Sequence, residues 1–187
     1  MPGSTKIAKF SSCLVGATLL GGCSLSLGAA GTRAWSSPTS SHIGFTTRGW
    51  FALPQEYRYV VGFETSVFGQ TSPSISSDQW RAGPVGGYSA RPDPTGIFGW
   101  EVLGRAQLMR GSQGTFNGVG FVFGADVGFP FQFKKPDPWN AGDFSSVRQY
   151  IVPSVGLNGV VGNHQSIHPE VIVTLSYRFE FTVGAVP

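Results

Sequence analysis

Residues 116–133 read FNGVGFVFGADVGFPFQF and form the longest strand signal in the chain. From residue 118 onward, apolar side chains take the odd positions, while glycine and polar residues take most of the even ones. Successive side chains of a strand point to opposite faces, so this period of two predicts a β-strand with one aromatic and one nearly bare face. The aromatic face holds Val119, Phe121, Phe123, Ala125, Val127, Phe129, Phe131 and Phe133, and the other holds Gly118, Gly120, Gly124, Asp126, Gly128 and Gln132.

The same period recurs on both sides of this stretch, and no helical spacing is sustained after residue 30. A further, weaker strand is expected near Thr32 to Ser37. Turn-forming residues separate the segments, which favours antiparallel neighbours. The sequence therefore predicts an all-β fold, an antiparallel up-and-down β-barrel of about eight strands. The other segments are 42–53, 57–67, 80–90, 98–108, 147–161 and 170–183.

The composition is unusual for a water-soluble domain. Charged residues make up 12% of the chain, against about 25% in ordinary soluble domains. Aromatic residues reach 13%, with 27 glycines and 15 phenylalanines. This mixture indicates β-structure with a crowded or lipid-facing surface. Lys134 and Lys135 form the one basic cluster, so a nucleic-acid partner, which requires a concentrated basic face, is not expected.

Two kinds of barrel fit the alternation, because a soluble barrel points its apolar face inward and an outer-membrane barrel points it at lipid. In the soluble case, the water-facing side of residues 116–133 would consist mainly of glycine. In the membrane case, the glycines lie in a narrow lumen and the phenylalanines contact acyl chains. Charges of both signs also fit a lumen, where they can pair: Arg48, Arg58, Glu64, Glu101, Arg105, Asp126, Arg178 and Glu180.

Strand length permits membrane crossing. An apolar band about 25 Å tall needs roughly 9 to 11 residues per tilted strand, and segments 57–67, 98–108, 119–133 and 171–183 reach that length. Over about residues 42 to 183 the pattern resembles the small bacterial outer-membrane β-barrels, which are typically eight-stranded. The resemblance implies membrane lipid as a partner, with an envelope protein or a second copy of the chain as further partners. An eight-stranded barrel has a filled interior, so no pore for large solutes is expected.

The N-terminus predicts export. Lys6 and Lys9 precede the apolar run FSSCLVGATLLGGC, residues 10–23, which is typical of a signal peptide over 1–22. The ending Leu20-Gly21-Gly22-Cys23 resembles the lipobox of bacterial lipoproteins, which implies cleavage before Cys23 and lipid attachment to its sulfur. A rival site, Gly28-Ala29-Ala30, would give a mature chain that begins at Gly31. Residues 23–41 are then predicted as a lipid-anchored tether or weak first strand, and 42–187 as the barrel domain.

One polar cluster offers candidate chemistry. His164 as base, Ser166 as nucleophile and Glu170 as orienting carboxylate match the parts of an activated hydroxyl. The His-x-Ser spacing resembles the lipid A deacylases, although Ile167 stands where that pattern has asparagine. Metal ligation is the alternative for His164, His168 and Glu170, but an extended strand spaces them too widely for one ion without a bend at Pro169. The favoured interpretation is a polar loop, with no catalytic residues, metal or cofactor.

These observations lead to one functional interpretation with two alternatives. We expect a non-enzymatic protein of the bacterial outer membrane, lipid-anchored, with a structural or surface-interaction role through loops 70–78 and 134–146. The first alternative is a lipid-tethered periplasmic β-barrel that binds a small apolar ligand, and the second is a lipid A deacylase-like hydrolase. The tryptophans fit either an aromatic girdle at the membrane interface or buried packing: Trp35, Trp50, Trp80, Trp100 and Trp139.

Overall fold

The described strands form one sheet in the computed structural model, and none of the described residues belongs to a helix that is long and apolar enough to cross a bilayer. The strands are β1 (Cys23–Ala34), β2 (Ser40–Ala52), β3 (Tyr59–Gln70), β4 (Asp78–Ala90), β5 (Trp100–Gln113), β6 (Phe116–Gly128), β7 (Phe131–Lys134), β8 (Ser146–Val161) and β9 (Ile167–Thr182). The structure describes residues 23–35, 40–52, 59–71, 78–90, 97–113, 116–134, 146–162 and 167–182.

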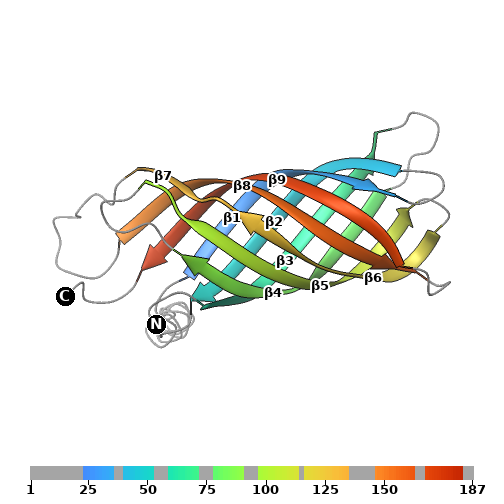
Figure 1. Ribbon diagram of the computed structural model, residues 1–187, viewed down its shortest axis with the longest axis horizontal. Coiled ribbons are helices and arrows are strands. Elements are labelled where there is room, and N and C mark those ends of the chain that lie inside the picture. Colours follow the sequence, from blue (N-terminus) through green and yellow to red (C-terminus); the bar gives the residue numbers. More distant parts are fainter. Residues whose placement is uncertain are drawn as a thin grey trace, which may run out of the picture.

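The sheet closes on itself (Figure 1). Neighbouring strands pair in the order β6-β5-β4-β3-β2-β1-β9-β8-β7, and an additional pairing joins β6 to β8. Every pairing between the described strands is antiparallel. Closure satisfies the backbone donors and acceptors that an open sheet leaves exposed at its edges. The fold is therefore a closed antiparallel barrel.

β6 and β7 act as a single wall strand. Gly128 lies opposite Ser154 and Phe131 lies opposite Ile151, so the register along β8 is continuous across the gap. Between them, the Phe129 amide donates to the Pro153 carbonyl at 2.9 Å. Pro130 has no N–H to donate, which explains the local break. Counted in this way the barrel has eight wall strands, which confirms the predicted fold class.

The first strand begins earlier than the sequence pattern suggested. β1 starts at Cys23 and pairs along its whole length with both β2 and β9. The weak strand expected near Thr32 to Ser37 overlaps β1 only at its last three residues, Thr32–Ala34, and a barrel boundary at residue 42 is too late. Small residues hide the alternation in this strand, especially Gly28-Ala29-Ala30-Gly31. Its conformation is set by the ladders of its two neighbours, which local propensity does not reveal.

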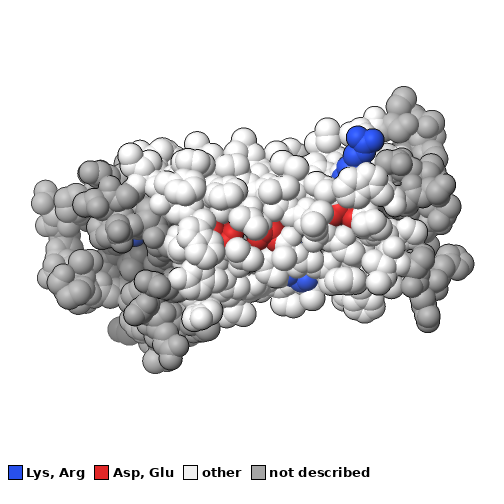
Figure 2. Space-filling view, in the orientation of Figure 1, with Lys and Arg blue, Asp and Glu red and all other residues white. Residues whose placement is uncertain are grey.

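The alternation sorts side chains between lumen and outer surface as expected for a membrane barrel. Phe121 and Phe123 of β6 are exposed on the outside, whereas Val122 and Asp126 are buried inside. Figure 2 shows an outer surface that is largely free of charged groups on the face in view. The exposed apolar side chains include Leu25, Leu27, Ile43, Phe45, Val61, Phe63, Val67, Trp100, Val102, Leu108, Val119, Val155, Leu157, Val173 and Leu175.

Some lumen-facing glycines are required by close backbone approach. A Cβ atom at Gly44 would overlap the Val67 carbonyl oxygen and approach Phe68 Cα at 2.7 Å. Outward-facing Gly49, on the same strand, has its nearest neighbouring atom, Ser24 O, at 3.9 Å from such a Cβ. Glycine inside a tightly curved barrel lets adjacent strands coil toward each other. This explains why one face of the strand pattern is nearly bare.

The barrel has two unlike ends. β1 begins and β9 finishes at the same end, here called the termini end (Figure 1). Connections 53–58, 91–96 and 135–145 leave from this end, and connections 36–39, 72–77, 114–115 and 163–166 leave from the opposite end. The predicted interaction loops 70–78 and 134–146 fall mostly outside the described residues. The strands that bracket them show that these two loops leave from opposite ends.

Candidate functional site

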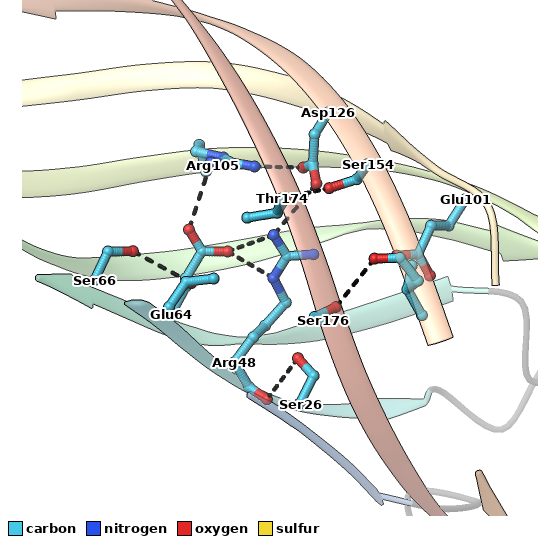
Figure 3. Close-up of polar contacts among 12 residues, drawn as sticks. Ser26, Arg48, Glu64, Ser66, Glu101, Arg105, Asp126, Ser154, Thr174 and Ser176 are labelled. Atoms are coloured by element: carbon cyan, nitrogen blue, oxygen red, sulfur yellow. Dashed lines mark hydrogen bonds and ion pairs between the residues drawn. The ribbon is translucent and has the colours of Figure 1, made fainter. Parts of the chain in front are cut away.

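The centre of the lumen holds a ring of ion pairs (Figure 3). Arg48 contacts Glu64 through Nε, at 2.6 Å, and its Nη2 lies 3.3 Å from Asp126 Oδ2. Arg105 lies between the same two carboxylates, with Nη1 at 3.5 Å from Glu64 and Nη2 at 2.7 Å from Asp126. The two guanidinium groups and the two carboxylates therefore alternate around a closed four-membered ring of ion pairs. All four side chains are buried.

This ring joins walls that are distant in the sequence. Arg48 is on β2 and Asp126 is on β6, which lie on opposite sides of the closed sheet. Gln107 of β5 donates to Glu64 at 2.9 Å, so that carboxylate accepts hydrogen bonds from Arg48 and Gln107 and forms an ion pair with Arg105. Buried charges are tolerated when paired and fully hydrogen-bonded. The central ring therefore ties the barrel wall together from inside.

A second ion pair lies toward the termini end. Arg178 of β9 donates through Nη1 and Nη2 to the two oxygens of Glu101 at 2.8 and 2.7 Å. The guanidinium carbon lies 4.2 Å from the ring centroid of Trp50, and that of Arg48 lies 5.6 Å from the same ring. A buried cation over an indole face gains cation–π attraction. Trp50 therefore links this pair to the central ring.

A third group lies toward the opposite end. Arg81 of β4 donates through both terminal nitrogens to Glu170 of β9, each at 2.6 Å. Asn158 donates to the same carboxylate at 2.9 Å, and Arg81 also donates to Gln79 at 2.8 Å. Gln79 in turn contacts His42 at 3.2 Å. The sequence pattern had not singled out Arg81, although its inward parity on β4 is the signal that could have found it.

These groups balance the charge of the lumen. Arg148 is half-buried and lies opposite Glu180 in the β8–β9 register. With that pair included, positive and negative groups are equal in number among the described lumen residues, so burial leaves no net charge to be neutralised. Bulky side chains that cross the lumen also leave little room for solutes. The buried charged residues are Arg48, Arg81, Arg105, Arg178, Glu64, Glu101, Asp126, Glu170 and Glu180.

The outer surface carries aromatic clusters near the termini end. Tyr88 lies between Tyr59 and Trp100, with ring centroids 5.6 and 5.2 Å away. Tyr177 packs edge-on against Phe179 at 4.7 Å, and its hydroxyl donates to Gln149 at 2.7 Å. Amphipathic rings of this kind sit at the boundary between acyl chains and headgroups in membrane proteins. This end therefore has the chemistry of an interfacial girdle.

The sequence allowed two roles for the tryptophans, an aromatic girdle at the membrane interface and buried packing, and the described tryptophans include both. Trp35, Trp80 and Trp100 are about half exposed on the outside, as girdle residues are, whereas Trp50 is buried in the lumen. Trp139 lies outside the described residues, as does Arg58 among the predicted lumen charges. The other charged residues assigned to a lumen are buried there.

The predicted polar cluster is placed only in part. Glu170 is buried and engaged by Arg81 and Asn158, so its carboxylate serves a lumen ion pair. His164 and Ser166 lie outside the described residues, and His168 is on β9. Among the residues that the structure describes, no group of three or more His, Cys, Asp or Glu side chains could hold a metal ion.

Cys23 occupies the first position of β1, at the termini end. It lies opposite Phe51 of β2 and Phe181 of β9. Ser24 and Ser26 are buried in the lumen, while Leu25 and Leu27 are exposed outside. By this parity, the Cys23 side chain belongs to the outward face, where it is partly exposed.

Comparison with known proteins places the fold but no family. No protein-family model matches the chain, and no curated protein matches it. Among solved structures it is similar to Neisserial surface protein A (NspA), with a TM-score of 0.56 and 12% identity over 86% of this chain and 96% of that one. It is also similar to Ail, the attachment invasion locus protein of Yersinia pestis, with a TM-score of 0.50 and 14% identity over 86% of this chain and 99% of that one.

Proposed function

We propose that this chain is a non-enzymatic outer-membrane β-barrel with a structural or surface-interaction role in the bacterial envelope. The observation that carries the proposal is the polarity of the barrel wall, because side chains such as Phe63 and Leu157 face outward while Arg48 and Asp126 are buried. A lipid-facing surface requires this arrangement. A soluble barrel that binds an apolar ligand would need a mainly apolar lumen, whereas the buried apolar side chains here form three separate small clusters between the ion pairs.

The filled lumen favours a structural or contact role over transport. Ion pairs span the lumen at three levels, and each level is formed by buried side chains. Conduction would require these pairs to separate at a cost of several kcal/mol each. The proposed protein therefore acts through its surfaces.

We assign the outward-facing interaction surface to the opposite end of the barrel. An exported chain reaches the outer membrane from the periplasm, so we place the end that holds both termini there, although connection 135–145 at this end is longer than the short periplasmic turns usual in this class. Connections 36–39, 72–77, 114–115 and 163–166 then face the exterior, and 135–145 faces the periplasm. The names of the two similar structures describe one as a surface protein and the other as an attachment protein, which agrees with a surface role here.

We further propose that Cys23 is the lipid-modified N-terminus. Two observations support cleavage before this residue. Cutting after Ala30 would remove most of β1 and its ladders with β2 and β9. The outward parity of Cys23 would direct a thioether-linked lipid toward the same membrane region as Leu25.

Fractionation of Gram-negative cells that express the full chain tests the membrane proposal. We expect the protein in the outer-membrane fraction, resistant to carbonate washing, with a folded band on gels that shifts after boiling. If residues 24–187, which lack the lipid-bearing Cys23, fold as a soluble β-domain in plain buffer, the proposal is contradicted and the tethered ligand-binding module is supported.

Intact mass and acyl labelling of the same protein test the modification. We expect a mature chain that begins at Cys23, carries acyl groups and loses the label in Cys23→Ala. An N-terminus at Gly31 would contradict both the lipid and the proposed cleavage. Activity toward lipid A that disappears in Ser166→Ala with the barrel intact would instead support the hydrolase alternative.

A further inference from the structure

The outer wall of β1 forms a shallow groove that runs toward the opposite end of the barrel. Its floor consists of Gly31 and Ala29, and a Cβ atom added at Gly31 would have its nearest neighbouring atom, His42 O, at 3.9 Å. Leu27, 60% exposed, closes the floor toward the termini end. Exposed apolar side chains of β2 and β9 lie directly opposite the floor residues in the register: Ile43, Phe45, Val173 and Leu175. We call these residues the β1 groove.

The width of the β1 groove suits one acyl chain. Neighbouring strands lie about 4.8 Å apart, so the wall strands β2 and β9 are separated by roughly 10 Å across β1. The wall side chains occupy part of this span, which leaves a channel about as wide as one hydrocarbon chain. Floor and walls are apolar, so the groove is suited to contact with acyl chains.

Arg33 lies at the end of the groove that is nearer the barrel opening. It follows Gly31 by two residues on the same face of β1, is exposed, and lies opposite Ser41 of β2 in the register. The sequence has no Asp or Glu before Glu56, and Glu170 of β9 is buried in the lumen. The described outer faces of β1, β2 and β9 therefore offer Arg33 no carboxylate. Its guanidinium is available for an external anion.

The position of Arg33 along β1 matches the level of lipid headgroups. Arg33 lies ten residues after Cys23 on the same face, and that length of tilted strand rises roughly 25 Å. The apolar band of an outer-membrane barrel has the same height. Trp35, 52% exposed, follows Arg33 on this face, and tryptophan is enriched where acyl chains meet headgroups. The guanidinium therefore lies at the headgroup level, and the groove lies within the acyl region.

We propose that the β1 groove binds lipid A, with one acyl chain over Gly31 and Ala29 and a phosphate against Arg33. A guanidinium can donate two parallel N–H bonds to phosphate oxygens, and Ser41 adds a hydroxyl on the neighbouring strand at the same level. This assignment rests on the proposed function, because that function places the opposite end at the cell exterior, where lipid A is the phosphorylated acyl lipid.

Arg110 of β5 provides a comparison at the same end of the barrel. It is also exposed on the outer face, where it lies opposite Trp80 of β4 in the register. Its surroundings differ, because Leu108, 49% exposed, occupies the floor position next to it. Asp78 is exposed on the same face of β4, two residues before Trp80. Arg110 therefore has a filled surface beside it and a carboxylate on the next strand, so it is the matched control for Arg33.

Native mass spectrometry of the full-length mature protein, released from detergent micelles, tests the proposal. The probes are lipid A, the same lipid A after removal of its phosphates, and phosphatidylglycerol. We expect lipid A to bind saturably and at lower concentration than either of the other lipids. Arg33→Gln should raise the half-saturating concentration about fivefold, the effect of one basic side chain at a membrane surface. Gly31→Leu, which fills the floor without changing the charge, should raise it by a similar factor.

Arg110→Gln and Gly104→Leu are the controls for charge and for volume. Gly104 is exposed on β5, and a Cβ atom there would have its nearest neighbouring atom, Gly86 O, at 3.7 Å. Both variants should bind lipid A as the unaltered protein does. If Gly31→Leu does not fold, Ala29→Phe fills the same floor.

Four results would overturn the proposal. They are equal losses in the two arginine variants, equal binding of dephosphorylated lipid A, equal binding of phosphatidylglycerol, and a protein dimer in place of the lipid complex. Any of them, in a barrel that keeps its heat-modifiable band, would leave the proposed function unchanged. A chain that is a soluble β-domain in plain buffer would overturn both.

Discussion

The lumen wall and the outer wall are built from alternate residues of the same strands, yet they are stabilised by different kinds of contact. On β3, Glu64 and Ser66 enter hydrogen-bonded lumen contacts, while Phe63 and Val67 on either side of them are exposed. Each lumen group depends on specific partners on other strands, whereas the outer residues need only be apolar and of suitable size. We therefore expect the lumen wall to be sensitive to small changes and the outer wall to tolerate most that keep its polarity.

The largest difference is expected from a paired glycine substitution on β2. Gly44→Val would drive a side chain into the backbone of β3, whereas Gly49→Val adds a side chain where the nearest atom is 3.9 Å from the new Cβ. We expect Gly44→Val to abolish the heat-modifiable folded band in lipid vesicles and Gly49→Val to retain it. Equal folding of both variants would refute the distinction between the walls.

Loss of one lumen charge should have the next largest effect. Glu64→Gln leaves Arg48 and Arg105 with Asp126 as their one remaining carboxylate in the central ring. Breaking a buried ion pair on one side costs about 3–5 kcal/mol, to be measured by urea unfolding in lipid vesicles. Ser66→Ala, on the same face, should cost only about 1 kcal/mol. Similar small losses for both variants would show that water screens the ring.

A charge on the outer wall should cost somewhat less. Phe63 is exposed near the middle of β3, opposite Gly49 and Pro84. Phe63→Arg should lower the free energy of unfolding by about 2–4 kcal/mol in vesicles, as charges at the bilayer midplane do. Phe63→Leu, which keeps the polarity, is the control and should cost far less. A stabilising effect of the arginine would mean that this face contacts water.

The smallest effect is expected from a hydrogen bond on the outer wall. The hydroxyls of Thr47 and Thr65 lie 2.6 Å apart on the exposed face. Polar pairs within membranes contribute about 0.6 kcal/mol on average, so Thr47→Val should change the unfolding free energy by less than about 1 kcal/mol. A loss as large as that of Glu64→Gln would show that specific polar contacts matter on both walls.

The sequence predicted the location of a side chain correctly where that location depends only on which face of its strand the residue occupies. The parity of Phe121 and Asp126 predicted which of them meets the lumen, because alternation is a local property of a strand. It did not predict the partner of Arg81, since Glu170 lies 89 residues away and the pairing depends on closure and register of the whole barrel. β1 was misjudged for a related reason, because its small residues carry little pattern and its neighbours impose the strand.

Quenching of tryptophan fluorescence by lipids brominated near the headgroup end of their acyl chains tests the central claim most directly. Two single-tryptophan proteins are compared in vesicles, one that retains Trp50 and one that retains Trp100, with all other tryptophans changed to phenylalanine. Trp50 is 4% exposed in the lumen and Trp100 is 46% exposed outside. The account predicts strong quenching of Trp100 and little of Trp50. Quenching of Trp50 as strong as that of Trp100, or of neither, would contradict a lipid-facing outer wall around a lumen filled by buried side chains.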